Sequence, residues 1–203
     1  MSGKLLLATS NEHKKKELKA ILRYEGVEIL TLEDIGKNLP PVIEDGESFA
    51  ENAAKKARLT AAASGCVCLA DDSGLQVEAL KGQPGVYSAR FAGEKANDEE
   101  NNAKLLTMIQ YFRGEQRKAE FVCVIAVSDP DGMVKTVRGV CPGHINDKPL
   151  GKNGFGYDPL FIPQGYSRTF AQLSETEKNV ISHRAKALKE VYYLLKEFNL
   201  VKR

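Results

Sequence analysis

The sequence lacks a hydrophobic run long enough to cross a membrane. A membrane-spanning helix needs about 20 consecutive apolar residues, whereas the apolar run near the start covers only residues 5–8. That run is also too short for the apolar core of a signal peptide. We therefore expect a cytoplasmic protein with no membrane partner.

A strong charge of one sign and the cysteine spacing of a zinc site are also lacking. The chain has 29 Lys and Arg residues against 27 Asp and Glu residues, which gives a net charge of +2. A dedicated nucleic-acid-binding protein is usually much more basic, so we expect no nucleic-acid partner. The four cysteines form no CxxC pair, and three of them sit in apolar stretches, which favours buried reduced thiols.

What is present is the composition of an ordinary globular protein. With 203 residues, 42% of them hydrophobic, the chain is long enough for one domain, or for two small lobes around one core. Aliphatic residues at 4–9 predict a buried strand, and the stripe formed by Leu18, Ile21 and Leu22 predicts the helix after it. Residues 27–30 predict a second strand, and this βαβ opening is typical of α/β folds.

The rest of the chain continues to alternate between helices and strands. The predicted elements, in chain order, are a helix at 48–63 that begins with a Ser48–Glu51 capping box, a strand at 66–70, a helix capped by Asp98, a β-hairpin of 121–127 with 134–140, a short helix that begins at Ser174-x-x-Glu177, and a last helix capped by Ser182. Residues 32–46 show no periodicity and predict an irregular connection.

The first candidate site follows the first predicted strand. It consists of Thr9, Ser10, Asn11, Glu12, His13 and Lys14. Free backbone N–H groups and the helix dipole at a strand-to-helix turn favour a phosphate. The segment lacks the glycines of a Walker A loop, and an ordinary helix cap has a similar sequence. On these residues alone, both an anion site and a plain cap stay open.

The second candidate site is acidic. Asp71 and Asp72, followed by Ser73, come directly after the strand predicted at 66–70, where the loops of open α/β sheets carry ligands. Together with an acidic turn at 44–45, they offer the oxygen ligands that Mg²⁺ prefers. A carboxylate beside such a metal can orient or deprotonate an attacking water. The alternative is a turn cap made by one aspartate with a solvated partner.

Basic residues and an aromatic loop complete the candidates. Lys56 lies four residues after Asn52, so both belong to one helix face. His183 and Arg184 fall in the first turn of the last predicted helix, where a cation is unfavourable unless an anion is near. Residues 154–159 combine two glycines, two aromatic residues and a carboxylate. Such rings can stack on a nucleobase, but they can also pack within a loop and only fix its conformation.

Six motifs are spread over nearly the whole chain, from Leu5 to about Leu195. They are Thr9-x-Asn11-x-x-Lys14, Ser48-Phe49-x-Glu51-Asn52-Ala53, Ala70-Asp71-Asp72-Ser73-Gly74-Leu75, Pro84-Gly85-Val86-Tyr87-Ser88-Ala89-Arg90, Gly154-Phe155-Gly156-Tyr157-Asp158-Pro159 and Ser182-His183-Arg184. Taken together, these motifs closely resemble the inosine triphosphate pyrophosphatase family.

The resemblance implies an enzyme that uses Mg²⁺ to hydrolyse ITP, dITP and XTP to the nucleoside monophosphate and pyrophosphate. A purine nucleoside triphosphate would thus be the substrate, and the nucleotide pool would be cleansed of deaminated purines. The implied fold is α/β: an elongated two-lobed body around a central mixed β-sheet with flanking helices and an active-site cleft between the lobes. The implied single domain covers residues 1–203, and the implied assembly is a homodimer.

The resemblance also implies roles for individual residues. The triphosphate would be held by Thr9, Ser10, Asn11, Glu12, His13, Lys14 and Lys56. Glu44 and Asp72 would bind the metal, with Asp45 and Glu47 as alternatives to Glu44, and Asp72 would also be the catalytic base. Ser73 would contact the substrate. The nucleotide and base pocket would contain Phe155, Gly156, Tyr157, Asp158, Lys178, His183 and Arg184, with Phe155 as the stacking ring.

Three other functions compete with this interpretation. An aspartate pair at a strand end also suits an aspartyl-phosphate phosphatase, which would release orthophosphate through a covalent intermediate. A pyrophosphatase for pyrimidine or modified nucleotides on a similar fold is disfavoured by the late aromatic and His-Arg motifs. A single-stranded RNA-binding module would use the lysines at 14–16 with aromatic residues, but the near-neutral charge weighs against it.

Overall fold

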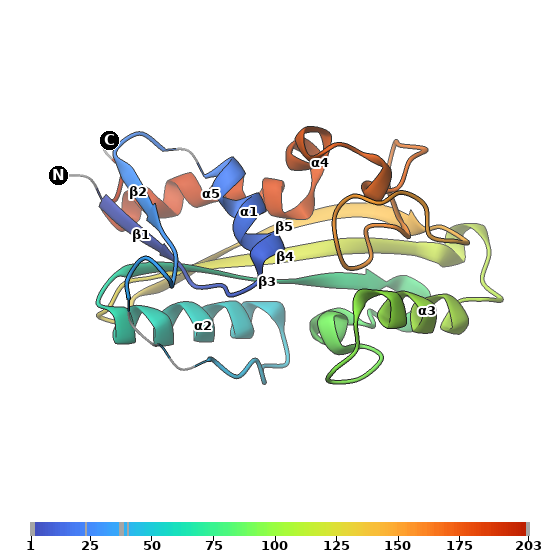
Figure 1. The fold of residues 1–203 in the computed structure, drawn as a ribbon, viewed down its shortest axis with the longest axis horizontal. Coiled ribbons are helices and arrows are strands. Elements are labelled where there is room, and N and C mark those ends of the chain that lie inside the picture. The colour runs from blue at the N-terminus through green and yellow to red at the C-terminus, as the bar shows by residue number, and fades with distance from the viewer. Residues whose placement is uncertain (1–2, 23, 37–38, 40, 202–203) are drawn as a thin grey trace. The chain divides into compact units, whose positions relative to one another are not determined.

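The computed structural model describes residues 3–22, 24–36, 39 and 41–201. These residues form an α/β fold with one six-stranded sheet in the order β2-β1-β3-β4-β5-β6 (Figure 1). The sheet is mixed, because β1 pairs in parallel with β2 and β3 whereas β5 pairs antiparallel with β6. The predicted α/β class, with a central mixed sheet and flanking helices, is therefore confirmed.

The elements agree closely with the predicted order. The strands are β1 (Gly3–Leu7), β2 (Val27–Leu30), β3 (Val67–Val77), β4 (Lys118–Ser128), β5 (Val134–Ile145) and β6 (Phe161–Pro163). The α-helices are α1 (Glu12–Ile21), α2 (Phe49–Ser64), α3 (Asp98–Met108), α4 (Glu175–Ile181) and α5 (His183–Glu197), and short 3₁₀ segments include η2 (Gly85–Arg90). None of the helices in the described part of the chain is long and apolar enough to span a membrane.

The chain divides into two units by its internal contacts. Unit 1 contains residues 1–72, 123–139 and 184–203, and unit 2 contains residues 73–122 and 140–183. Each unit has its own apolar core. The assignment of residues 1–203 to a single domain stays a prediction.

Alternation along the strands of unit 1 supplies apolar side chains to both faces of the sheet. Leu5, Leu7 and Leu69 belong to a core cluster with Leu188 of α5. The intervening residues of β1 and β3 point the other way, and Leu6 packs in a separate cluster with Ala61 of α2 and Cys68 of β3. Helices α1 and α5 accordingly cover one face, and α2 covers the other (Figure 1). Successive residues of β3 therefore face different helices.

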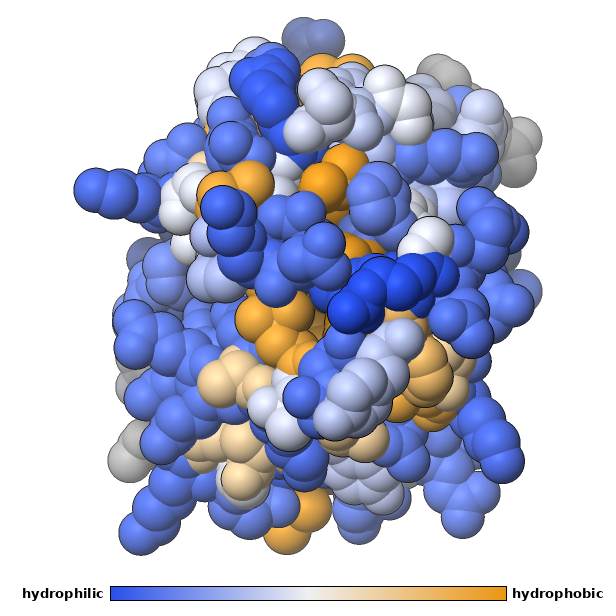
Figure 2. Space-filling view, turned by 90° about the vertical axis from the view of Figure 1, so that its right-hand side faces the viewer, coloured by the Kyte–Doolittle hydropathy of each residue, from blue (hydrophilic) through white to orange (hydrophobic). Residues whose placement is uncertain are grey.

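Unit 2 has a core rich in aromatic residues. Phe121, Phe161 and Phe170 contact one another, with ring centroids 4.8 to 5.8 Å apart. Segment η2 packs directly against β3 at Gly74, where a Cβ atom would lie 2.3 Å from Ser88 Oγ. This close approach requires glycine. The side of unit 2 that Figure 2 views is mainly hydrophilic, with apolar residues in small groups.

The strand predicted at 66–70 continues much further than expected. β3 runs from Val67 to Val77 and passes through Asp71 and Asp72, so the prediction of a ligand-carrying loop directly after residue 70 is wrong. Two consecutive carboxylates normally disfavour a strand. Here both are buried with hydrogen-bond partners, which removes the reason for the strand to end.

Two helix starts also differ from the predicted caps. The N-cap of α3 is Asn97, which forms a capping box with Glu100, and Asp98 is the first helical residue. At α2, Ser48 accepts a hydrogen bond from Glu51 N as predicted, but the Glu51 carboxylate accepts from Glu47 N instead of closing the box. Several cap-forming residues compete at each start, and the entering backbone selects among them.

The other predicted local features are present. The capping box at Ser174 is complete, and α5 begins directly after Ser182. The predicted hairpin is formed by β4 and β5, and Gly132 N donates to Asp129 O in the turn between them. All four cysteines are free, and Cys68, Cys123 and Cys141 are buried, so the prediction of buried reduced thiols is confirmed for three of them.

Candidate functional site

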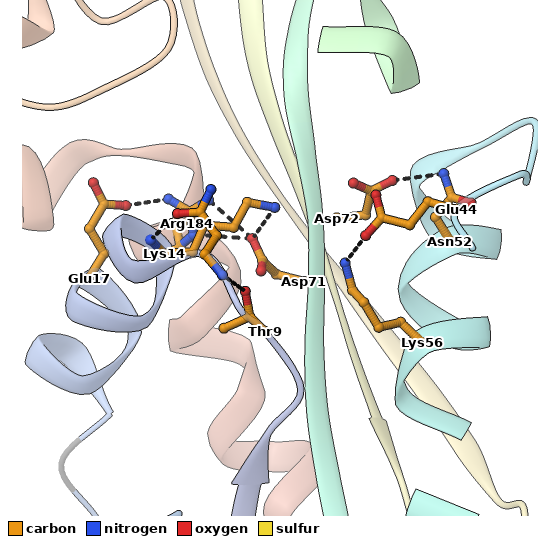
Figure 3. Close-up of polar contacts among 10 residues, drawn as sticks. Thr9, Lys14, Glu17, Glu44, Asn52, Lys56, Asp71, Asp72 and Arg184 are labelled. Atoms are coloured by element: carbon orange, nitrogen blue, oxygen red, sulfur yellow. Dashed lines mark hydrogen bonds and ion pairs between the residues drawn. The ribbon is translucent and has the colours of Figure 1, made fainter. Parts of the chain in front are cut away.

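Asp71 and Asp72 lie side by side in β3 but point to opposite faces of the sheet (Figure 3). Asp71 projects toward α1 and α5, and Asp72 projects toward α2 (Figure 3). Both side chains are buried, at 0% and 5% exposure. The strand alternation separates them, so the predicted carboxylate pair is instead two acidic groups with different partners.

Asp71 belongs to a buried network of charges. Its Oδ2 atom accepts a hydrogen bond from Arg184 Nη2 at 3.1 Å and lies 3.3 Å from Lys14 Nζ. Arg184, which is 1% exposed, also donates to Glu17 of α1. Burial opposes ionisation of Asp71, but the charges of Lys14, Arg184 and Lys56 outweigh it and hold the pKa of this carboxyl well below its usual range.

Asp72 faces a different group of residues on α2 and the preceding segment. Asn52 Nδ2 donates to Asp72 Oδ2 at 3.0 Å, and Lys56 Nζ donates to Glu44 Oε1. Asn52 and Lys56 are one helical turn apart, so α2 presents both from one face. Burial raises the pKa of Asp72, and the nearby Glu44 carboxylate raises it further, despite the opposing charges of Lys14 and Lys56.

The donor set beside Asp72 fits a hard divalent cation. Glu44 and Asp72 supply two carboxylates on one side of β3 (Figure 3). Mg²⁺ is usually bound through one or two carboxylates, with water and substrate phosphates in the other positions. Of the alternatives to Glu44, Asp45 pairs with Lys55 at 2.5 Å and Glu47 is exposed. The described residues contain no cluster of three or more His, Cys, Asp or Glu that could hold a metal.

The segment from Thr9 to Lys14 forms the N-terminus of α1. Asn11 is the N-cap, because its side chain accepts a hydrogen bond from Lys14 N at 3.1 Å. Thr9 is buried and accepts from Asn11 N at 3.2 Å. Ser10, Glu12 and His13 are exposed, and the Glu12 carboxylate pairs with Lys15. The predicted plain cap is therefore present, and the exposed N-terminus remains open to an anion.

A second group of predicted residues lies in unit 2. Asp158 Oδ2 accepts hydrogen bonds from Phe155 N at 3.0 Å and from Lys178 Nζ at 2.5 Å. Lys178 Nζ also lies 4.9 Å from the centroid of the Phe155 ring. Asp158 and Lys178 are 2% and 5% exposed, whereas Phe155 is half-buried. The buried ion pair thus holds the backbone and one face of a partly open aromatic ring.

The neighbouring aromatic groups support this arrangement from inside unit 2. The Tyr157 hydroxyl donates to Ser88 O at 2.9 Å, and burial raises the pKa of Tyr157. His183 is 4% exposed, and its ring stacks on Phe121 with centroids 4.7 Å apart. Although His183 and Arg184 are adjacent in sequence, they have different surroundings. Ser73 is half-buried in β3.

Several residues of these networks have other roles than the sequence predicts. Asp71 is predicted as part of an acidic metal site and Asp98 as a helix cap, whereas Glu17, Asn52 and Asn102 have no predicted role. Asp98 and Asn102 hydrogen bond to Gly156. The only signal for Asp71 is a charge inside an otherwise apolar strand, which implies a buried partner. That partner, Arg184, is 113 positions away in sequence, so no local pattern identifies it.

Known proteins resemble this chain over almost its entire length. The Ham1 family model matches residues 5–193. The dITP/XTP pyrophosphatase of Desulforamulus reducens is 49% identical over 192 residues, which cover 95% of each chain. The dITP/XTP pyrophosphatase of Bacillus subtilis is 46% identical over 190 residues, which cover 94% of this chain and 96% of the relative. The structure of a HAM1 protein from Coxiella burnetii matches with a TM-score of 0.87 and 39% identity, covering 96% of this chain and 99% of that one. This chain therefore belongs to the Ham1 family.

Proposed function

We propose that this protein hydrolyses the deaminated purine nucleoside triphosphates ITP, dITP and XTP to the nucleoside monophosphate and pyrophosphate. The observation that carries this proposal is the full-length match to relatives named dITP/XTP pyrophosphatase, at 46 to 49% identity. In the reaction, the oxygen of one water attacks the α-phosphorus and the bond from that phosphorus to the bridging oxygen breaks. Pyrophosphate leaves with that oxygen.

Asp72 would act as the general base. A carboxylate with a raised pKa is a stronger proton acceptor than an ordinary one, which suits removal of a proton from water. Asn52 would keep the carboxylate oriented through its hydrogen bond. Glu44 and Asp72 would hold Mg²⁺, which when bound neutralises part of the triphosphate charge. The two-carboxylate donor set supports this choice of metal.

The triphosphate would be bound by cations and by the N-terminus of α1. Lys56 would contact it on the α2 side of β3, and Lys14 on the α1 side. Thr9, Ser10 and Asn11 would line the approach to the helix. Since the Glu12 carboxylate pairs with Lys15, Glu12 and His13 would contribute backbone N–H groups of the first helical turn. Arg184 would act through Asp71, which positions Lys14.

The purine would be recognised by residues of unit 2. Phe155 would stack on the base, and Gly156, Tyr157 and Asp158 would hold the loop that carries this ring. Hypoxanthine and xanthine have a 6-oxo group, which accepts a hydrogen bond from Lys178 or His183. The 6-amino group of adenine would leave that donor unpaired, and such a mismatch is strongly discriminated against. Ser73 would make a further contact with the substrate.

We predict that the purified protein releases pyrophosphate from ITP, dITP and XTP with Mg²⁺, and far less from ATP and GTP. Orthophosphate should appear only when inorganic pyrophosphatase is added, and a metal chelator should stop the reaction until Mg²⁺ is restored. Direct release of orthophosphate would instead identify a phosphatase. A salt-sensitive shift with single-stranded RNA, without any hydrolysis, would favour a binding module.

Phe155→Ala should raise KM for ITP while kcat changes little. Loss of one stacking contact costs on the order of 1–3 kcal/mol, or about 5- to 150-fold in KM. Phe155→Tyr keeps a ring and should restore most of the affinity. Tyr111→Ala is the matched control, because it removes an aromatic side chain that is 82% exposed in the same unit. An unchanged KM in Phe155→Ala would remove Phe155 from the stacking role.

Two further expectations concern the assembly and the location of the protein. A homodimer is expected, and light scattering coupled to size-exclusion chromatography measures its mass directly. A cytoplasmic location is expected from the role in cleansing the nucleotide pool. Both stay predictions.

A further inference from the structure

Gly156 is held at both of its backbone polar groups by one helix. Asp98 Oδ2 accepts a hydrogen bond from Gly156 N at 2.6 Å, and Asn102 Nδ2 donates to Gly156 O at 2.9 Å. Both side chains come from α3 and are four residues apart, which places them on one face of the helix. Gly156 has a φ of +60°, a conformation that glycine adopts without strain.

The surroundings of Asp98 and Asn102 explain why both side chains hydrogen bond to the loop 154–158. Asn97, not Asp98, caps the helix, so the Asp98 carboxylate is available to reach Gly156. Its charge is also favourable in the first turn, at the positive end of the helix dipole. Asn102 is buried, and its Oδ1 atom has no hydrogen-bond partner in the described part of the chain. A buried amide is costly unless it bonds, and the Gly156 carbonyl supplies that bond.

Helix α3 is anchored independently of the loop. Asn101 donates to Ala89 O at 3.1 Å and accepts from Ala92 N at 2.7 Å. Lys104 donates to Phe91 O at 2.5 Å, and Leu105 is fully buried. These contacts attach α3 to the segment around η2, so Asp98 and Asn102 project from a rigid support.

The loop 154–158 is therefore held on both sides of its aromatic ring. Asp158 accepts from the backbone N–H of Phe155, and the α3 residues hold the next peptide at Gly156. A residue between two fixed backbone points has few orientations for its side chain. The half-buried Phe155 ring, with Lys178 Nζ 4.9 Å from its centroid, thus extends from a backbone that is held on both sides.

We propose that Asp98 and Asn102 are positioning residues that preorganise Phe155 to receive the purine of the substrate. This inference rests on the proposed function, since it assigns the loop to base binding. Neither residue contacts the base. They act by keeping the loop ordered before the substrate arrives, which lowers the entropic cost of binding.

Kinetics of Asp98→Ala and Asn102→Leu test the proposal. Loss of either hydrogen bond should raise KM for ITP about tenfold with kcat nearly unchanged. Asp98→Asn keeps an acceptor oxygen and should recover most of the lost affinity. Inhibition by inorganic tripolyphosphate, which has no base, should keep its Ki in all variants. Glu99→Ala is the matched control, because it removes an exposed carboxylate from the same helical turn.

Amide hydrogen exchange gives a second readout that needs no substrate. Residues 154–158 should exchange faster in Asp98→Ala and Asn102→Leu than in the parent chain or in Glu99→Ala, while β4 keeps its protection. Unchanged exchange in the loop, or an unchanged KM for ITP in folded variants, overturns the proposal. An equal change in KM for ITP and in the Ki for tripolyphosphate also overturns the proposal, because it would show that the substitution disturbs the structure in general and not base binding in particular. If the parent chain does not hydrolyse ITP, the proposed function is wrong. The proposal that Phe155 is positioned for a purine is then wrong as well, whatever the rate of amide hydrogen exchange in residues 154–158.

Discussion

Asp72→Asn is expected to reduce kcat for ITP by about 10²- to 10⁴-fold, the usual contribution of a general base. The amide has the shape of the carboxylate but cannot take a proton from the attacking water. Its oxygen can still accept the hydrogen bond from Asn52, so nucleotide binding should persist. Steady-state kinetics and calorimetric titration with ITP measure the two effects separately.

The same substitution should leave the fold intact. Burial raises the pKa of Asp72, which means that folding disfavours its charged form relative to the neutral one. A neutral amide of equal size therefore removes an unfavourable charge, and the melting temperature should stay the same or rise slightly. Unchanged turnover in this variant would remove Asp72 from the base role, and a large fall in melting temperature would contradict our account of its environment.

Asp71→Asn should have the opposite outcome, with a loss of about 3–5 kcal/mol in the free energy of unfolding at neutral pH. The substitution removes the anion between Arg184 and Lys14, and Arg184 is fully buried. For a chain of this size, such a loss lowers the melting temperature by roughly 6–20 °C. Thermal and urea denaturation measure it.

The pH dependence of the Asp71 contribution has a definite sign. Its pKa is lower in the folded chain than in the unfolded chain, so the folded state binds the proton less tightly. The contribution is present above the unfolded-state pKa, near 3.9, and is lost as pH falls toward the folded-state value. Asp45→Asn is the control, because the Asp45 side chain that pairs with Lys55 is 65% exposed, and exposed ion pairs contribute little to stability. A similar small loss in Asp71→Asn would contradict the buried-network interpretation.

Most elements of the fold follow from local sequence patterns. The βαβ opening, α2, the β4–β5 hairpin and the Ser174 capping box were all predicted from periodicity, caps and turn residues. Each of these signals acts over a few residues, because side-chain spacing sets which face is apolar and turn chemistry sets where the chain reverses. The family resemblance likewise depends on short motifs, and the match of the Ham1 family model to residues 5–193 confirms it.

The extension of β3 could not be predicted in the same way. Charged residues at 71 and 72 read as the end of a buried strand, since an unpaired buried carboxylate is strongly unfavourable. Their partners come from other elements, with Lys14 and Arg184 on one face and Asn52 on the other. The prediction of Asp98 as the cap of α3 is wrong for a related reason. The Asp98 carboxylate accepts a hydrogen bond from Gly156 N, 58 positions later in the sequence.

The sequence by itself determined the α/β class, the order of the elements, the family and the residue types available for chemistry. The tertiary structure alone decided that Asp71 faces away from Asp72 and neutralises Arg184. It also decided that Arg184 and His183 have separate surroundings, and that α3 holds the loop of Phe155. The physical reason is that hydrophobic periodicity is local, whereas the pairing of a buried charge or amide depends on groups that only folding brings within hydrogen-bonding distance.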